Sequence, residues 1–384
     1  MKHRIFLILL SAVVMSAAGC PKAPKPSSPD SPGQSSPEKT DAPEKTVSEP
    51  DTDSIVLQIE AVFGEVERDR KGTLIGVNLA KGRSSVPDEI LQQALLIPNL
   101  RKLRAAGGTV SQETLGKIAG QKSLEELYLQ DTPVRDADLQ VILSGLPKLT
   151  RLTLRSSPNV TDQGISHIAA HSRLKSLSLI GIPLSRAGLE EILRMKTVKG
   201  LDLRDCSSLT SEDYTLLAGM PQLTDLKVGG FSITDEVLKT MVKLPNLTGL
   251  TIDDAMISPA GFAEMASNKD WAAKITTLVF NRDMQLFDEA MLSLRHFPNL
   301  RRLTICDMMV SGEFLEKLAA EETARPKLET LSLRKTLLTL EGVTALKKYR
   351  ELTSLDLSCV SVTPEMMEIL NRLDSLKTLN LECQ

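Results

Sequence analysis

Aromatic residues and histidines are scarce in this chain of 384 residues. Aromatic residues make up 3% of it, with one tryptophan and three tyrosines, and there are four histidines. Proteins that bind single-stranded nucleic acid stack bases on aromatic side chains, and acid–base catalysis most often uses histidine. A formal net charge of −3 also argues against the electrostatic attraction that drives nucleic-acid binding. The composition therefore disfavours both a nucleic-acid-binding protein and an enzyme.

Catalytic and metal-binding motifs are also missing from the sequence. It contains no H-E-x-x-H, G-x-S-x-G, P-loop or G-x-G-x-x-G pattern and no C-x-x-C pair. His167 and His171 are spaced so that a helix would place both on one face, as zinc requires, but no third ligand is evident. We therefore expect two solvent-facing histidines near the end of a helix, no cofactor and no enzymatic activity.

Long apolar runs are absent except near the beginning of the sequence. There a basic start precedes an apolar run over residues 5–18, and small residues precede Cys20. This segment resembles a bacterial lipoprotein signal peptide, in which residues 1–19 are removed and Cys20 carries lipid on its thiol. An ordinary secretory signal with an incidental cysteine is the alternative, because Ala17 stands where leucine is usual.

Residues 20–53 differ in composition from everything that follows. They are dominated by proline, serine, threonine and charged residues, so they cannot bury enough apolar surface to fold. We expect a disordered tether that holds the following domain on the order of 30 Å from a membrane. Together with lipid on Cys20, this predicts a protein anchored in the bacterial cell envelope, facing the periplasm or the cell surface.

Residues 54–384 are built on a recurring Leu-x-x-Leu-x-Leu phrase. Most steps between successive phrases are 24 or 25 residues long, and two are 28. The fourth and sixth positions of each phrase point to the same side of a β-strand, and the remaining length suits a helical return. Stacked units of this kind predict a long parallel sheet. The phrases begin at Leu74, Leu100, Leu124, Leu149, Leu174, Val198, Leu223, Leu247, Ile275, Leu300, Leu328, Leu352 and Leu376.

The return segments carry helix-start signals. An acid or a proline follows Thr161, Thr234 and Thr363 directly. The threonine hydroxyl can cap the first turn, while the acid or proline suits the first helical positions. Apolar residues recur three or four places later, as at Ile165 and Ile168. Each unit is thus expected to be a strand, a turn and a short capped helix.

With these phrases and helix starts, residues 54–384 resemble the leucine-rich repeat superfamily. The resemblance implies an α/β fold, a right-handed horseshoe solenoid with a parallel sheet on its concave face and short helices on its convex face. Residues 54–73 resemble the helix and hairpin cap that precedes many bacterial repeat domains, and Cys206 resembles the cysteine-containing subtype. The family's usual asparagine after the strand is replaced by Thr132, Ser157, Ile182, Cys206, Phe231, Ala255, Asp283 and Met308.

Two cysteines near the end of the sequence occupy equivalent places. Cys359 and Cys383 lie in adjacent repeats, whose strands would be about 4.8 Å apart. A disulfide is compatible with this spacing, but such directly opposed neighbours are often strained, and small buried thiols are common core fillers. We therefore favour free thiols at these positions. No cap pattern follows the last strand, so we expect that edge to be open or covered by a partner.

Function is expected on the outward strand positions, which curvature gathers into one concave surface. Their mixed charge suits a protein or peptide ligand better than a lipid or a small apolar molecule. Gly200, Gly229 and Gly249 are expected to leave a shallow hollow there. The alternatives are a structural spacer without a ligand and, less favoured, an enzyme. The predicted partner-binding residues are Lys102, Arg104, Tyr128, Arg151, Arg155, Asp202, Arg204, Asp225 and Lys227.

The two longer steps add residues near positions 267–271 and 320–324. Both insertions are expected at the same edge of the solenoid, where insertions often serve binding. Trp271 is the only tryptophan and the best candidate for an anchor at that edge. The other interpretation is that its side chain simply fills the longer loop.

Overall fold

The structure is a computed structural model that describes residues 51–81, 85–320 and 325–382. The predicted signal peptide, Cys20 and nearly all of the predicted tether lie outside these residues, as do Cys383 and most of the second insertion. Within the described residues, no helix combines the length and the apolar character needed to cross a membrane.

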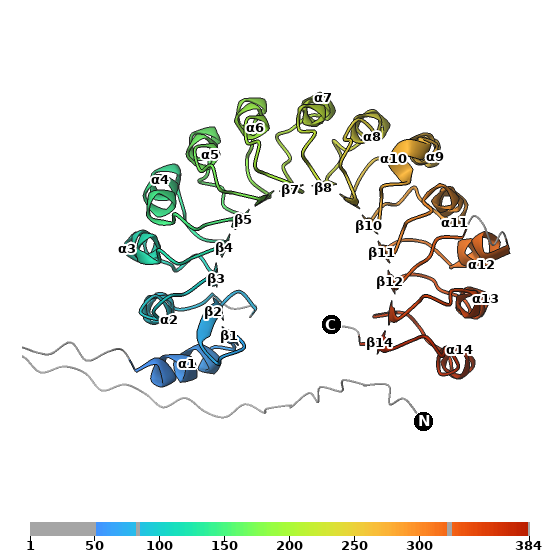
Figure 1. Cartoon of the computed structure of the whole chain (residues 1–384), viewed down its shortest axis with the longest axis horizontal. Coiled ribbons are helices and arrows are strands. Elements are labelled where there is room, and N and C mark those ends of the chain that lie inside the picture. Colours follow the sequence, from blue (N-terminus) through green and yellow to red (C-terminus); the bar gives the residue numbers. More distant parts are fainter. Residues whose placement is uncertain (1–50, 82–84, 321–324, 383–384) are drawn as a thin grey trace, which may run out of the picture. The chain divides into compact units, whose positions relative to one another are not determined.

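The described residues build one sheet whose strands follow each other in sequence order (Figure 1). The first pair is antiparallel and every later pair is parallel. Leu127 pairs with Leu103 on one side and Leu152 on the other, so equivalent phrase positions are in register. The strands are β1 Glu65–Arg68, β2 Leu74–Asn78, β3 Lys102–Ala106, β4 Glu126–Gln130, β5 Arg151–Arg155, β6 Ser176–Ile180, β7 Gly200–Leu203, β8 Asp225–Gly229, β9 Gly249–Asp253, β10 Thr277–Asn281, β11 Arg302–Cys306, β12 Thr330–Arg334, β13 Ser354–Asp356 and β14 Thr378–Asn380.

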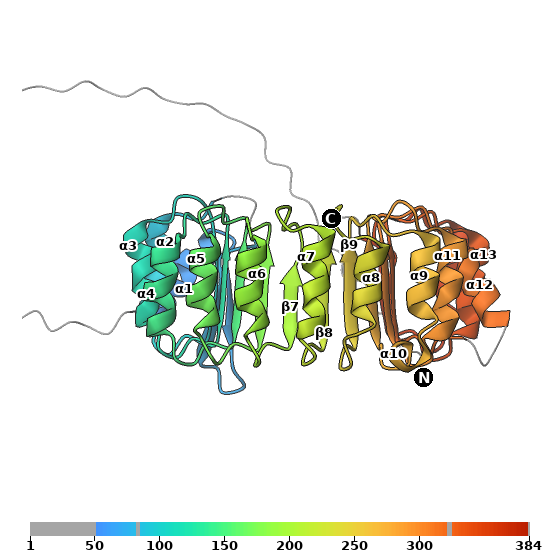
Figure 2. The same cartoon turned by 90° about the horizontal axis from the view of Figure 1, so that it is seen from above.

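Short helices return the chain from the end of one strand to the start of the next. The strands line the inner side of the arc and the helices form its outer layer (Figure 1), running alongside the strands (Figure 2). The α-helices are α1 Thr52–Ala61, α2 Asp88–Ala94, α3 Gln112–Lys117, α4 Asp136–Gly145, α5 Asp162–Ala169, α6 Arg186–Leu193, α7 Ser211–Thr215, α8 Asp235–Met241, α9 Pro259–Ala266, α10 Lys269–Ala272, α11 Asp288–Met291, α12 Glu313–Ala320, α13 Leu340–Ala345 and α14 Pro364–Leu370, and the 3₁₀ helices are η1 Ile118–Gly120, η2 Leu216–Gly219, η3 Leu292–His296 and η4 Leu346–Lys348.

The core lies between these two layers and confirms the predicted strand register. Leu127 and Leu129 of β4 are buried, whereas the residues between and around them are not. On the helix side, Ile165 and Ile168 of α5 pack into the same core. Because every repeat contributes the same positions, the apolar layer continues along the solenoid, and the predicted parallel sheet with helices on its other side is confirmed.

Helix starts also follow the prediction. Thr161 and Thr363 are the N-caps of α5 and α14, and their hydroxyls accept from the backbone N–H groups of Gln163 and Met366. Thr234 is the N-cap of α8, although its hydroxyl makes no capping bond.

An aspartate ladder that the sequence did not suggest joins the helix starts of neighbouring repeats. Asp235 Oδ1 and Oδ2 lie 2.8 and 2.6 Å from the backbone N and Oγ of Ser258, the N-cap residue of the next helix. Asp136 accepts from Thr161 of the next repeat in the same way, at 2.8 and 2.6 Å. At each of these junctions, the carboxylate ties the helix start of its own repeat to the helix start of the next repeat. Its members are Asp88, Asp136, Asp162, Asp235 and Asp288.

Glycines in the first helical turn leave room for this ladder. A Cβ on Gly261 would lie 2.0 Å from Asp235 Oδ1, and one on Gly188 would lie 2.3 Å from Asp162 Oδ1. The carboxylates therefore occupy the space that a side chain at either position would need.

The turns after the strands are formed without the asparagine that is usual in leucine-rich repeats. The residue that leaves the strand adopts a positive φ at several aspartates, including Asp131, Asp205 and Asp307, a conformation that aspartate tolerates better than most residues. In the turn after β10 the positive-φ residue is Arg282. The next residue, Asp283, is buried, and its Oδ1 accepts from the backbone N–H of Gln285 at 3.3 Å. Burial raises the pKa of this carboxyl to about 6.

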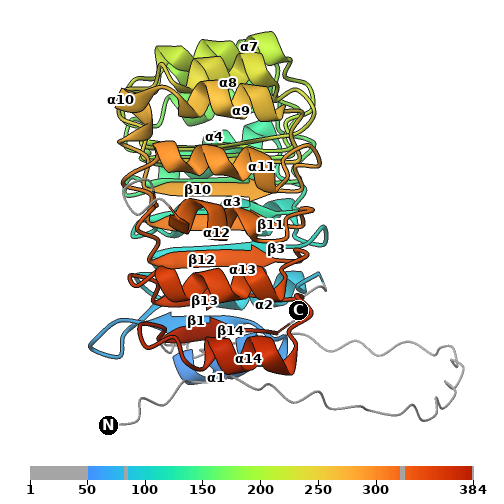
Figure 3. The same cartoon turned by 90° about the vertical axis from the view of Figure 1, so that its right-hand side faces the viewer.

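The first repeat is preceded by a helix and a hairpin. Ile55 and Ile59 of α1 are buried, and β1 pairs antiparallel with β2. The chain turns sharply between α1 and β1 at Gly64, where a Cβ would lie 2.7 Å from a methyl carbon of Ile59. Helix α1 therefore packs on the first core layer, next to α2 (Figure 1). Figure 3 views the same arc from the side of its C-terminal repeats.

Candidate functional site

The concave face has two regions of different character. On β3 to β5, the predicted residues Lys102, Arg104, Tyr128, Arg151 and Arg155 all lie at outward positions and are at least partly exposed. On β7 to β9, Asp202 and Asp253 are buried and contact Arg204, while Asp225 and Lys227 are half-buried. The two regions are described in turn.

Tyr128 is the centre of the first region. The guanidinium carbon of Arg104 lies 5.6 Å from the centre of the Tyr128 ring, and the Tyr128 hydroxyl bonds to Gln130. Arg155 pairs with Gln130 across the β4–β5 strand pair and acts electrostatically on the same phenol. Burial raises the pKa of Tyr128, and the two arginines oppose that shift. The ring therefore has Arg104 against it and Arg155 two residues further along the next strand.

These two arginines are not neutralised locally. Among the residues that the structure describes, no carboxylate lies within ion-pair distance of Arg104 or Arg155. Lys102 and Arg151, by contrast, pair with Glu67 at 2.6 Å and Glu126 at 2.5 Å. Arg104, Tyr128 and Arg155 are called the Arg–Tyr–Arg cluster below. It can accept a carboxylate beside an apolar or aromatic side chain.

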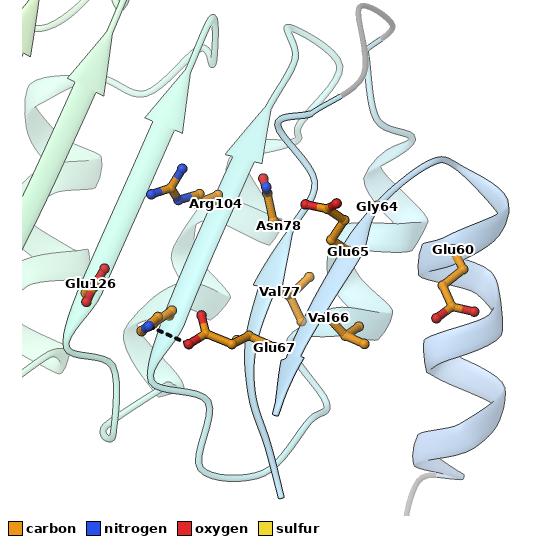
Figure 4. Close-up of a pocket in the computed structure, with 11 residues that line it drawn as sticks. Glu60, Gly64, Glu65, Val66, Glu67, Val77, Asn78, Arg104 and Glu126 are labelled. Atoms are coloured by element: carbon orange, nitrogen blue, oxygen red, sulfur yellow. Dashed lines mark hydrogen bonds and ion pairs between the residues drawn. The ribbon is translucent and has the colours of Figure 1, made fainter. Parts of the chain in front are cut away.

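A hollow of about 530 Å³ adjoins this cluster where the sheet begins (Figure 4). Glu65 and Glu67 reach it from β1, Asn78 from β2 and Arg104 from β3, so the hairpin forms one wall. Glu67 of this wall forms an ion pair with Lys102 of the next repeat. The sequence prediction named Lys102 and Arg104 but missed the three glutamates of the lead-in segment that line the hollow with them, Glu60, Glu65 and Glu67. The alternation of Glu65 and Glu67 in β1 was the available signal for two of them.

In the middle region, the predicted residues Asp202 and Arg204 form an ion pair with each other. Asp202 is buried, and Arg204 Nε and Nη2 donate to its Oδ1 and Oδ2 at 2.9 and 2.8 Å. The Arg204 guanidinium also reaches Asp253, two repeats away, at 3.4 Å. Arg282 contacts the other oxygen of Asp253 at 2.7 Å. Asp202, Arg204 and Asp253 are therefore paired with one another, and a partner that binds here would have to compete for these bonds.

The expected glycine hollow is filled for the same reason. A Cβ on Gly229 would lie 3.3 Å from Arg204 Cγ and 2.6 Å from the Asp253 carbonyl oxygen. A Cβ on Gly249 would lie 2.6 Å from an oxygen of Asp225. The glycines let long side chains cross between repeats rather than leaving a ligand pocket. Burial raises the pKa values of Asp225 and Asp253, while Lys227 opposes the shift at Asp225 and Arg282 and Arg204 oppose it at Asp253.

Two further candidates turn out to be structural. Trp271 is buried in α10 and packs edge-on against Phe297, with ring centres 6.1 Å apart, so it fills the longer repeat and is no surface anchor. His171 lies beyond the end of α5, and its Nε2 is 3.0 Å from the carbonyl oxygen of Leu146. Both histidines are half-buried, which corrects the expectation of solvent-facing side chains on one helix. No group of three metal-ligating residues occurs in the described part of the chain.

The cysteines depart partly from expectation. Cys206 and Cys306 are free, and the Cys206 thiol donates to the carbonyl oxygen of Leu179 at 2.9 Å inside the core. Cys359 is disulfide-bonded, so the expectation of a free thiol there is wrong. Its expected neighbour, Cys383, lies outside the described residues. Burial raises the pKa of the Cys206 thiol to about 12, which removes it as a reactive nucleophile.

The repeat geometry decides the architecture. Each unit is a strand with two buried apolar residues followed by a capped helix, and the strands stack in register. The fold is a leucine-rich repeat solenoid. No protein-family model matches this chain.

Several known proteins are similar to this leucine-rich repeat chain. The Caenorhabditis elegans protein EEED8.10, whose name refers to RNA binding, is 24% identical over 347 residues, which cover 77% of this chain. The match spans about half of that protein, 46% of its length.

Solved structures are similar to this chain at lower sequence identity. The internalin InlF of Listeria monocytogenes matches with a TM-score of 0.42 and 18% identity, over 87% of this chain and 89% of its own. Yeast Rad7, solved as a complex with Elc1, matches with a TM-score of 0.49 and 19% identity, over 77% and 78%. The structure of TLR13 with a single-stranded RNA matches with a TM-score of 0.39 and 20% identity, over 75% of this chain and 36% of its own.

Proposed function

We propose that this leucine-rich repeat protein binds another protein or a peptide through the N-terminal part of its concave face. The observation that carries the proposal is the Arg–Tyr–Arg cluster: an aromatic ring with Arg104 against it and Arg155 on the next strand, two arginines that lack carboxylate partners among the described residues. Arginine and tyrosine dominate the energetics of many interfaces because they combine contact area with directed hydrogen bonds. A partner that presents a carboxylate next to an apolar side chain would satisfy all three residues.

The adjoining hollow supports the same site. It is lined by Arg104 and gives the partner a concave wall. In this wall the positive charge of Lys102 is paired with the negative charge of Glu67. A protruding side chain or chain terminus of the partner would lose contact with water there. In the middle of the concave face, by contrast, Arg204 is paired with both Asp202 and Asp253.

The proposal is tested by double substitution at the cluster. A photo-crosslinking residue at Gln130 would first identify the partner in the native membrane. We then expect Tyr128→Ala with Arg155→Ala to weaken binding of that partner about tenfold to a hundredfold, because both side chains are interface anchors. Calorimetry or surface plasmon resonance would measure the dissociation constant.

The matched control lies on the convex side. Glu190 and Glu191 of α6 form only short-range ion pairs, with Arg186 and Arg194, so Glu190→Ala with Glu191→Ala should leave binding unchanged. Loss of binding in the control alone would move the site to the helices. Unchanged binding in both variants would place the partner on another surface, and failure to crosslink any partner would favour a spacer without a ligand. Because one relative is named for RNA binding, single-stranded RNA serves as a competitor, and displacement of the protein partner by RNA would contradict this proposal.

We further propose that the protein is a lipid-anchored protein of a bacterial envelope. The support is the sequence alone: an apolar run over residues 5–18 with small residues before Cys20, then a segment poor in apolar residues. The whole repeat domain would then be displayed at the membrane surface.

Replacing Cys20 by serine tests the anchor. We expect Cys20→Ser to abolish incorporation of labelled fatty acid and to shift the protein to an unprocessed or soluble form, because the lipid is proposed to be attached to the Cys20 sulfur. Metabolic labelling followed by membrane fractionation measures both effects. Persistent fatty-acid labelling of the variant would show that the lipid attaches elsewhere or that the labelling has another source.

A further inference from the structure

Positively charged side chains collect along the edge of the solenoid where the strands begin. The strands from β2 onward are parallel and in register, so the loops that lead into them lie at one common edge. Figure 2 shows the strands and helices of the arc spanning the same height between two such edges. The loops before β5, β6 and β7 contain lysine and arginine but no aspartate or glutamate. Their exposed cations are called the basic edge below: Lys148, Arg173, Lys175, Lys196 and Lys199.

No acid offsets the charges of the basic edge. Among the residues that the structure describes, no carboxylate lies within ion-pair distance of these side chains. Lys243 and Lys274 continue the edge before β9 and β10, where Asp270 of α10 stands beside Lys269. Acids on the elements that adjoin the basic edge are already paired: Glu125 and Glu126 with Arg101 and Arg151, and Glu190 and Glu191 with Arg186 and Arg194.

Acids dominate the opposite edge, where the strands end and the helices begin. The aspartate ladder lies there, and aspartates also follow several strands. Arg186 and Arg282 at this edge are paired with acids, at 3.2 and 2.7 Å. An extended anionic surface would therefore attract one edge of the solenoid and repel the other. Besides the ladder, the acids of this edge include Asp131, Asp205, Asp254 and Asp307.

The repeat fold does not require the basic edge. A helix dipole favours cations in the last turn of a helix, but Arg173 and Lys175 lie beyond the end of α5 at Ala169. Lys199 N donates to the carbonyl oxygen of Lys175 at 2.8 Å, so the backbones of these two residues join neighbouring loops while their side chains remain exposed. The two charges therefore lie side by side without a structural partner.

We propose that the basic edge docks the repeat domain on the headgroups of an anionic phospholipid membrane. The choice of a membrane rests on the proposed lipid anchor, whose tether would keep the domain on the order of 30 Å from a bilayer. Anionic headgroups attract lysine and arginine that come within about 8 Å of them at physiological salt. Cations on successive loops of one edge suit a flat charged surface, since they do not converge on a hollow.

This orientation leaves the concave face open. The strands run from one edge of the solenoid to the other (Figure 2), so a domain that rests on its basic edge would hold the sheet upright on the membrane. The Arg–Tyr–Arg cluster on β3 to β5 would then face sideways, where a partner can reach it.

Nucleic acid is the competing anionic partner. Proteins that bind single strands stack bases on aromatic side chains. The loops before β5, β6 and β7 contain no phenylalanine, tyrosine or tryptophan. The composition of the basic edge therefore favours lipid phosphates over an RNA strand, and RNA is included in the test.

Vesicle binding of the full chain with Cys20→Ser tests the edge without a lipid on residue 20. The vesicles contain phosphatidylcholine alone or with an equal part of phosphatidylglycerol, which is anionic. Cosedimentation should show at least about tenfold tighter binding to the anionic vesicles, and added salt should reduce the difference because it screens the charges. The basic start of the sequence favours anionic lipid too, but it is the same in every variant, so the variants decide.

Lys175→Glu with Lys199→Glu, made in this chain, should weaken binding to the anionic vesicles about tenfold or more, because two attractive charges become repulsive. Thermal unfolding should be unchanged, since both side chains are exposed. The matched control is Arg334→Glu with Lys335→Glu, which changes the net charge equally at the end of β12, on the opposite edge. This control should bind the vesicles like the parent chain.

Four results would overturn the proposal. Equal weakening in both variants would mean that net charge alone drives binding, and unchanged binding of the Lys175 and Lys199 variant would place the contact elsewhere. Displacement from the vesicles by inorganic phosphate at constant ionic strength would assign the edge to a single phosphate group. Binding of single-stranded RNA that is lost in the Lys175 and Lys199 variant, without vesicle binding, would assign it to nucleic acid. Fatty-acid labelling of Cys20 is independent of all four, so failure of this proposal is distinguishable from failure of the proposed anchor.

Discussion

Leu177→Asp is expected to destabilise the repeat domain by several kcal/mol. Leu177 occupies the fourth position of its phrase on β6 and is 0% exposed. It pairs in register with Leu152 and Leu201, so the new carboxylate would lie in a layer of leucines without a hydrogen-bond partner. Burying an unpaired polar or charged group costs about 2–7 kcal/mol, a large part of the stability of a typical domain. Urea unfolding followed by circular dichroism measures the loss.

The adjacent residue provides the control. Ser178 lies on the outward side of the same strand and is partly exposed, so Ser178→Asp should cost less than about 1 kcal/mol. Because Ser178 pairs with Asp202 across β7, Thr153→Asp on β5 serves as a second outward control away from that acid. If Leu177→Asp and the two outward variants unfolded at the same urea concentration, the strand register described above would be wrong.

The fold could be predicted because its information is local and repeated. Leu127 and Leu129 identify a strand face by their spacing alone, and the same spacing recurs in each repeat. Thr161 and Thr363 mark helix starts through hydrogen bonds to residues two or three places away. In a solenoid each unit contacts mainly its neighbours, so a correct unit gives the correct stack.

The middle of the concave face could not be predicted for the opposite reason. Arg204 and Asp253 are 49 residues apart and meet only because Gly229 leaves the intervening strand bare. The sequence listed Arg204, Asp202 and Gly229 correctly as outward positions, but a long side chain selects its partner in three dimensions. Outward position on a strand is therefore a weaker statement than availability to a ligand. The Arg–Tyr–Arg cluster meets the stronger condition.

The edges of the solenoid were also missed, although a signal was present. Lys148, Arg173 and Lys196 lie in loops that contain no acid, but they precede the strand phrase. His171 was placed on a helix by its spacing to His167, whereas the helix ends at Ala169. Helix ends and turns depend on contacts with the adjacent repeat, and a pattern within one repeat does not contain them.

Asp235→Ala is expected to destabilise the domain by about 2–4 kcal/mol, because the side chain serves two repeats at once. Its two oxygens accept from the backbone N and the hydroxyl of Ser258, and the Ser258 hydroxyl in turn accepts from Gly261 N at 3.0 Å. Hydrogen bonds to a charged group contribute about 1.5–3 kcal/mol each, and a donor left without its partner adds a penalty. Thermal and urea unfolding measure the change in the free energy of unfolding.

The neighbouring Glu236 separates this ladder from simple charge effects at a helix start. Glu236 is also an acid in the first turn of α8, but its side chain is exposed and contacts only Lys239, at 2.8 Å. Both acids are favoured by the helix dipole, which contributes at most about 1 kcal/mol at such a site. Glu236→Ala should therefore cost much less than Asp235→Ala. Equal losses would mean that the dipole explains both residues and that the bonds to Ser258 add nothing. A larger loss at Asp235 would show that its carboxylate stabilises the cap of the next repeat.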